Sequence, residues 1–140
     1  MAFLNISAKH KKGILRKIDD ERYLGLNECT RLELYSFMVA LGFASSYPSD
    51  FDGSKESLVR EEYTKTNNIC YAFSALYFNE HKDKIEEIAD TDKVFALADK
   101  YANTGFSVMA DYINEYSQNA LAMKLLADMD AMYEQYHDSF

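Results

Sequence analysis

The sequence is poor in the residues that build tight turns and cross-links. Its 140 residues include one proline, five glycines, two cysteines and no tryptophan. A β-sandwich or β-barrel needs many turns made from proline and glycine, so their scarcity favours helices. Cys29 and Cys70 fit no metal-ligand or redox spacing, and we expect two small reduced core residues.

Long apolar runs are also missing. No stretch approaches the roughly 18 residues of a membrane-spanning helix. The basic residues near the start follow a short apolar run instead of preceding it, which is the reverse of a signal peptide. These absences predict a cytoplasmic protein with no membrane contact.

The motifs that mark common catalytic and metal sites are absent. His10, His81 and His137 do not lie three or four residues from one another, and the chain contains no His-Glu-x-x-His or Cys-x-x-Cys pattern. The five glycines are scattered and form no phosphate loop. We therefore expect no metal, no cofactor and no catalytic residue. An enzyme whose site is assembled from distant carboxylates remains open, because such a site leaves no linear motif.

Charge is distributed unevenly along the chain. Lysines and arginines number 15 and acids 23, for a net charge of −8. Residues 1–18 carry five bases and no acid (+5), so the rest carries 10 − 23 = −13. We interpret this as a solvated basic first helix on an acidic body. The acidic body disfavours general nucleic-acid binding, and the first helix supports at most weak, salt-sensitive contact. This basic patch comprises Lys9, Lys11, Lys12, Arg16 and Lys17.

Apolar residues recur with a helical period over most of the chain. Gly42 is placed to end the second helix in the left-handed conformation. Ser54 is placed to cap the third helix, with Ser57 as the alternative cap. Glu33, inside the most apolar helix, is expected to pair with Arg31 or Arg60.

The apolar stripes before and after Gly105 are in phase and favour one long helix, with a break at Gly105 as the alternative. The predicted helices span about 8–20, 31–42, 54–80 with a distortion near 64–68, 83–89, 92–117 and 118–136. The predicted fold is all-α: a single domain, 1–140, forming a compact bundle of five to six helices.

Tyrosine is unusually frequent, with 11 residues beside 9 phenylalanines. Tyrosine is enriched at interfaces because one end is apolar and the other polar. The C-terminal third combines tyrosines with carboxylates, so it is either core or a partner-binding surface. The candidate partner-binding residues are Tyr112, Tyr116, Tyr133, Tyr136, Asp128 and Asp130.

Two segments carry a family resemblance. Residues 32–43 read Leu-Glu-Leu-Tyr-Ser-Phe-Met-Val-Ala-Leu-Gly-Phe, and Arg60-Glu61-Glu62 follow them. Residues 92–106 end in Ala-Asn-Thr-Gly-Phe. Over about half the chain, this pattern resembles small helical accessory proteins associated with bacterial DNA-phosphorothioation and related anti-phage defence islands. The resemblance implies a helical accessory subunit acting beside a larger enzyme, with no catalytic residues to carry over.

The sequence thus leads to a non-enzymatic interaction subunit, expected in a bacterial anti-phage defence or mobile-element system. Its partner would be a larger protein or a second copy of the chain. The alternative is an acidic inhibitor of the anti-restriction or anti-CRISPR type, which would mimic nucleic acid with its −13 body.

Overall fold

The computed structural model describes residues 3–45, 47–51, 53–66 and 68–138. Helix makes up 76% of it, with one small two-stranded sheet, so the predicted helical class is confirmed. In chain order the elements are β1 (Phe3–Ser7), α1 (Ala8–His10), the π-helical turn η1 (Lys11–Leu15), α2 (Arg16–Glu21), the 3₁₀ segment η2 (Tyr23–Glu28), α3 (Arg31–Ala44), β2 (Lys55–Arg60), α4 (Glu61–Thr66), α5 (Ile69–Glu80), the 3₁₀ turn η3 (Ile85–Ala89), α6 (Thr91–Glu115) and α7 (Gln118–Asp138).

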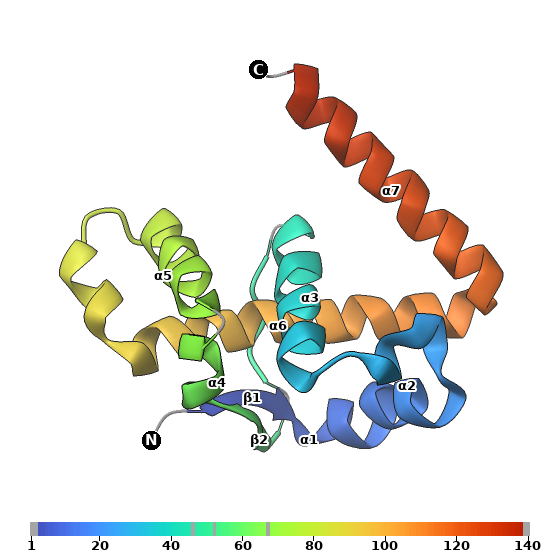
Figure 1. Cartoon of the computed structure of the whole chain (residues 1–140), viewed down its shortest axis with the longest axis horizontal. Coiled ribbons are helices and arrows are strands. Elements are labelled where there is room, and N and C mark those ends of the chain that lie inside the picture. Colours follow the sequence, from blue (N-terminus) through green and yellow to red (C-terminus); the bar gives the residue numbers. More distant parts are fainter. Residues whose placement is uncertain (1–2, 46, 52, 67, 139–140) are drawn as a thin grey trace.

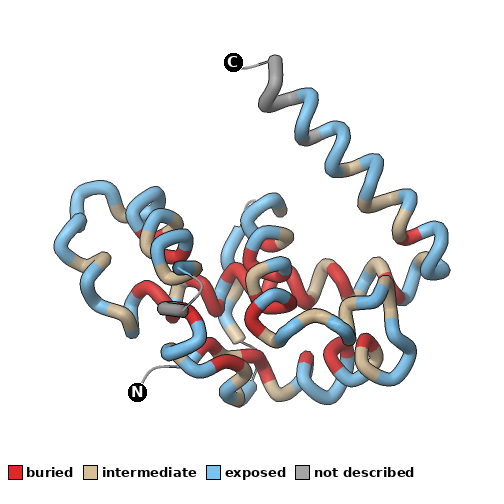
Figure 2. The backbone as a smooth tube through the Cα atoms, in the orientation of Figure 1, coloured by how far each residue is buried: buried red, intermediate tan, exposed pale blue. Residues whose placement is uncertain are grey.

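Helix α6 is the central element (Figure 1). Helix α3 crosses it, β1 lies along it, and α5 and η3 pack near its N-terminal end. Buried residues are concentrated on α6 and on the segments that touch it, whereas α7 is exposed over most of its length (Figure 2). The single long helix expected from the in-phase stripes is confirmed, and it begins where Asp90 accepts hydrogen bonds from the backbone N–H groups of Asp92 and Lys93.

Two glycines allow α3 and α6 to touch backbone to backbone. A Cβ placed on Gly105 would lie 1.9 Å from the carbonyl oxygen of Met38, and one on Gly42 would lie 1.9 Å from that of Tyr101. The prediction that Gly42 ends its helix is wrong, because α3 continues to Ala44 with Gly42 buried inside it. Gly105 neither breaks nor ends α6. Both glycines serve the helix crossing.

The weak helix formers before Gly105 also have a tertiary role. The Asn103 side-chain amide donates to Ser49 Oγ and to the Asp50 carbonyl, both at 3.0 Å, and Thr104 donates to Ser49 Oγ at 2.8 Å. The Ser49 N–H donates to the Lys100 carbonyl at 3.1 Å. These bonds hold the loop between α3 and β2 against α6.

The sheet is the main departure from the predicted fold. Strand β2 occupies residues 55–60, where the sequence predicts the start of a helix capped by Ser54, so that prediction is wrong. β2 pairs antiparallel with β1, with Phe3 opposite Arg60 and Ser7 opposite Lys55. The helical segment that follows divides into α4 and α5 near the predicted distortion, with Asn68 in the left-handed region at φ 58°. Pairing with β1, which lies about 50 residues away in the sequence, overrides the local helical period.

One buried carboxylate joins three elements. Asp99 of α6 accepts the Tyr35 hydroxyl of α3 at 2.7 Å, and it accepts the backbone and side-chain N–H groups of Asn5 in β1 at 2.8 and 3.0 Å. Burial raises the pKa of Asp99, and these hydrogen bonds oppose the rise. The network sets the position of β1, and therefore of β2, relative to α3.

Glu33 does not pair with an arginine as the sequence predicts. It lies exposed in the first turn of α3, where its backbone N–H donates to Thr30 Oγ1 at 3.1 Å and its carboxylate accepts the Thr30 hydroxyl at 3.2 Å. This is a helix cap related to the capping box. Arg31 instead binds Asp19 with two hydrogen bonds, at 2.7 and 3.2 Å.

Several tyrosines donate hydrogen bonds to carboxylates. Their ionisation makes the free energy of unfolding depend on pH in the alkaline range. The hydrogen bond to Glu87 raises the pKa of Tyr77 to about 12, and burial together with the Glu80 bond raises that of Tyr101 to about 12. Burial also raises the pKa of Tyr35. In the unfolded chain these phenols ionise near pH 10.

We therefore expect the free energy of unfolding to fall as the pH rises from 10 to about 12. In that window the unfolded chain binds fewer protons than the folded chain. Urea unfolding followed by circular dichroism over this range measures the slope. Tyr77→Phe should make the slope shallower, and a stability that stays flat over the window contradicts the prediction.

Candidate protein-docking surfaces

The junction between α6 and α7 determines where α7 points. Helix α6 ends at Glu115, and the backbone of its C-cap residue Tyr116 is extended. The Ser117 carbonyl then accepts the Leu121 N–H at 2.8 Å at the start of α7. The Gln118 side chain bonds the Glu21 carbonyl at 3.3 Å and the Leu24 N–H at 3.4 Å. With Leu121 fully buried, the first turn of α7 is attached to η2, and the remaining turns run away from the body (Figure 1).

Three of the predicted partner-binding residues lie at this junction. Tyr112 donates its hydroxyl to Asp128 at 3.5 Å and packs edge-to-face on Tyr116, with ring centroids 6.2 Å apart. Lys124 pairs with Asp128 at 3.2 Å. All four side chains are half-buried. Their contacts orient α7, so Tyr112, Tyr116 and Asp128 face the chain's own helices.

The opposite side of α7 carries an exposed apolar stripe, which we call the outer face. Its members recur every three or four residues and therefore share one side of the helix. Tyr133 belongs to this stripe, with Asp130 and Glu134 exposed beside it. The side chain of the predicted residue Tyr136 lies outside the described part of the chain. The outer face comprises Met123, Leu126, Met129 and Tyr133, which are 68%, 56%, 62% and 67% exposed.

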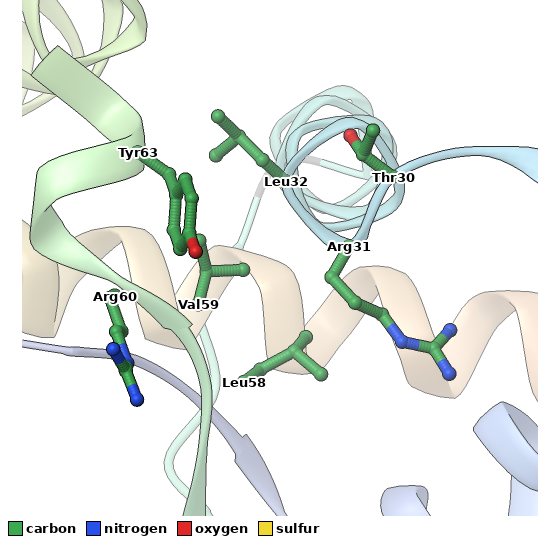
Figure 3. A pocket seen from close by; sticks show the side chains of 7 residues that line it. All are labelled: Thr30, Arg31, Leu32, Leu58, Val59, Arg60 and Tyr63. Atoms are coloured by element: carbon green, nitrogen blue, oxygen red, sulfur yellow. The ribbon is translucent and has the colours of Figure 1, made fainter. Parts of the chain in front are cut away.

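A second candidate surface is a groove of about 390 Å³ between the start of α3 and the β2–α4 corner. In Figure 3 the side chains of Leu32, Leu58, Val59 and Tyr63 surround it, with Arg31 on the α3 side and Arg60 on the β2 side. Thr30 completes the lining. We call it the Arg31–Arg60 groove. Its volume lies in the range of pockets that bind drug-sized ligands.

An irregularity in β2 shapes this groove. The register shifts so that Leu4 pairs with Val59 and Asn5 with Ser57, which leaves Leu58 without an opposite residue. Successive side chains of a regular strand point to opposite faces, yet Leu58 and Val59 both line the groove. A bulge re-aims side chains in this way. The sequence gives no sign of the groove, because a bulge and its pairing partner are not visible in a local pattern.

The predicted basic patch is interspersed with acids. Lys11 pairs with Glu56 at 2.9 Å, and Arg16 lies 3.8 Å from Asp20. Asp19 and Asp20 line the same shallow pocket as Lys11, Lys12 and Arg16. Lys9 is exposed and Lys17 half-buried. The nearby carboxylates reduce the positive potential that phosphate binding requires, so the structure does not strengthen the nucleic-acid hypothesis.

Sequence reasoning missed one pair with the geometry of a nucleophile and a base. Ser107 Oγ lies 3.1 Å from His10 Nε2, and the His10 ring stacks on Phe106. Burial lowers the pKa of His10, which favours the neutral imidazole. Neither residue lines the Arg31–Arg60 groove or the shallow pocket beside Lys11. The contacts account for the pair as packing of the chain's first helical turn on α6.

Within the described ranges, no group of three or more His, Cys, Asp or Glu residues could hold a metal ion. None of the helices described here is long and apolar enough to cross a membrane.

Comparison of the chain with protein-family models, with curated proteins and with solved structures found no match. What the protein does must therefore be inferred from its own surfaces.

Proposed function

We propose that this protein is a non-enzymatic interaction subunit that docks onto a larger protein through the outer face of α7. One observation carries the proposal. Leu126, Met129 and Tyr133 occupy positions i, i+3 and i+7 of a helix that leaves the body, and all three are more than half exposed. This spacing is that of an amphipathic helix inserting into an apolar groove of a partner.

Burial of the outer face would supply a favourable part of the free energy of docking. Burying each of the three side chains contributes about 1.5–3 kcal/mol. Association costs several kcal/mol in lost freedom, but α7 is already helical and fixed at its first turn, so little further ordering is needed.

The charges on α7 indicate which kind of surface the partner presents. Asp130 and Glu134 lie beside the outer face, and no lysine or arginine follows Lys124. A complementary groove would have an apolar floor and a basic rim. The resemblance described above would place the larger partner in a bacterial defence or mobile-element system.

The test is to place a photo-crosslinking residue at Met129 and, in a separate variant, at Ala131 on another side of α7. In the native host we expect one protein partner to crosslink from position 129 and not from 131. The partner should be lost when Leu126→Asp and Met129→Asp are combined and retained in Ala131→Asp, because only the first pair places charge in the apolar interface. Equal crosslinking from both positions contradicts the proposal.

The nucleic-acid-mimic alternative has less support. A mimic of a phosphate backbone needs regularly spaced carboxylates without neutralising bases. Several acids of this chain instead pair with lysines or arginines, among them Asp19, Glu56, Glu87 and Asp128.

A further inference from the structure

The chain carries both members of a complementary pair, the outer face of α7 and the Arg31–Arg60 groove. We propose that α7 of one copy docks in the groove of a second copy, and that the exchange is reciprocal. The inference rests on the proposed function, since it uses the same outer-face residues, and it adds an occupant for this chain's own groove.

Helix α7 does not occupy the groove of its own chain. The Gln118 side chain attaches the first turn of α7 to Glu21 and Leu24. From there α7 rises above α6 in Figure 1, whereas β2, which carries one wall of the groove, lies below α6. An exposed apolar groove and an exposed apolar helix face therefore remain on the same molecule, and a second copy covers both at once.

Charge favours the groove over direct pairing of two α7 helices. In an α7–α7 contact the acids that flank each outer face would lie near one another, and no lysine or arginine follows Lys124 to compensate them. Like charges brought together across an interface cost free energy. In the groove, Asp130 and Glu134 instead meet a surface bounded by Arg31 and Arg60, so the two surfaces are complementary in charge as well as in polarity.

Both arginines have donors to offer. A guanidinium has five N–H donors, and the hydrogen bonds from Arg31 to Asp19 use two of them. Arg60 lies 3.7 Å from Glu62, and the two side chains are 62% and 56% exposed. An exposed pair at that distance contributes little, so Arg60 can exchange its partner for a carboxylate of α7 at small cost.

Reciprocal exchange also closes the assembly. A one-way contact between a helix and a groove would leave an unfilled groove at one end and a free helix at the other, and it would propagate into chains. Two copies related by a two-fold axis fill both grooves and cover both helices, so the expected product is a dimer of defined size.

The first experiment measures the mass of the full chain by light scattering over a concentration series. We expect a dimer for the wild-type protein and for Ala131→Asp, the matched control on another side of α7. The combination of Leu126→Asp and Met129→Asp should give monomers. Arg60→Glu should weaken dimerisation by at least about tenfold, because the two-fold axis makes each lost contact count twice. Circular dichroism confirms that each variant is folded.

The second experiment mixes the two defective variants. Arg60→Glu has a damaged groove and an intact α7, and the Leu126→Asp, Met129→Asp variant has the reverse. In an exchange dimer their mixture regains one intact contact and forms a one-to-one heterodimer. In addition, Asp130→Arg with Glu134→Arg should restore dimerisation to the Arg60→Glu chain. The charge on α7 is then reversed together with the charge at position 60, so the two surfaces attract again.

Three results overturn the inference. A wild-type monomer at every concentration does so while leaving α7 available for a different protein, and the proposed function then stands. A dimer that needs the outer face but ignores Arg60→Glu indicates α7–α7 pairing. A dimer that needs the groove but not the outer face indicates another occupant, such as a strand added to the edge of β2.

Discussion

Replacing Gly105 with alanine should reduce the free energy of unfolding by about 2 kcal/mol. The new Cβ would lie 1.9, 2.7 and 2.9 Å from the carbonyl oxygen, carbonyl carbon and Cα of Met38. These are backbone atoms inside α3, so no side-chain rotation relieves the clash and the two helices must separate. Overpacking costs about 1–3 kcal/mol and sometimes more, which outweighs the roughly 1 kcal/mol that alanine contributes to helix propensity. The midpoint of denaturant unfolding measures the loss.

Three further variants show whether the close crossing of α3 and α6 is the cause. Gly13→Ala is the matched control, since a Cβ there meets nothing within 4 Å, and it should cost nothing or stabilise by up to about 1 kcal/mol. Gly42→Ala should resemble Gly105→Ala. The double variant at Gly42 and Gly105 should lose less than the sum of the single losses, because one separation of the helices relieves both clashes. A fully stable Gly105→Ala protein would show that the helices do not approach this closely.

Replacing Asp99 with alanine should cost about 3 kcal/mol. It removes the acceptor of the Tyr35 hydroxyl, which is fully buried, and of two N–H groups of Asn5. A buried donor left without a partner costs about 1–3 kcal/mol. The loss is smaller than a sum over three donors, because burying the carboxylate is itself unfavourable, as the raised pKa of Asp99 indicates. Urea unfolding near neutral pH measures the difference.

The controls separate the hydrogen bonds from the charge. Asp111→Ala, on the exposed side of the same helix, should change stability by no more than about 0.5 kcal/mol. Tyr35→Phe removes one donor and leaves the Asn5 bonds, so it should cost about 1 kcal/mol. Folded Asp99 keeps its proton to a higher pH than the value of 3.8 for an unperturbed aspartate. Its contribution to stability therefore falls as the pH rises above 3.8, and Asp99→Asn should remove that part of the pH dependence. An Asp99→Ala loss no larger than that of Asp111→Ala contradicts the network.

The local pattern of apolar residues predicts the long helices of this protein well, but it does not predict the sheet. The helix at 91–115 follows from an apolar stripe that stays in phase for seven turns and from a cap at Asp90. The helix at 118–138 likewise follows from its stripe. Residues 55–60 have the same kind of local pattern, but pairing with β1 decides their conformation. A contact between segments so far apart leaves no periodic trace in either one.

The candidate surfaces were partly visible in the sequence. The C-terminal tyrosines and carboxylates were identified, but periodicity alone does not say which side of α7 faces the body. Tyr112 and Asp128 turned out to orient the helix, whereas Tyr133 and Asp130 lie toward solvent. The groove was not predicted, because its lining comes from three separate segments and depends on the bulge at Leu58.

The sequence by itself determined the helical class, the extent of α6 and α7 and the polarised charge, because these depend on residue type and on spacing within one segment. Only the tertiary structure decided the role of Gly42 and Gly105 in the helix crossing, the pairing of β1 with β2, the hydrogen-bond partners of Asp99 and the direction of α7. Each of these is a contact between residues distant in the chain, and its energy arises from close packing and from hydrogen bonds that exist only once the chain has folded.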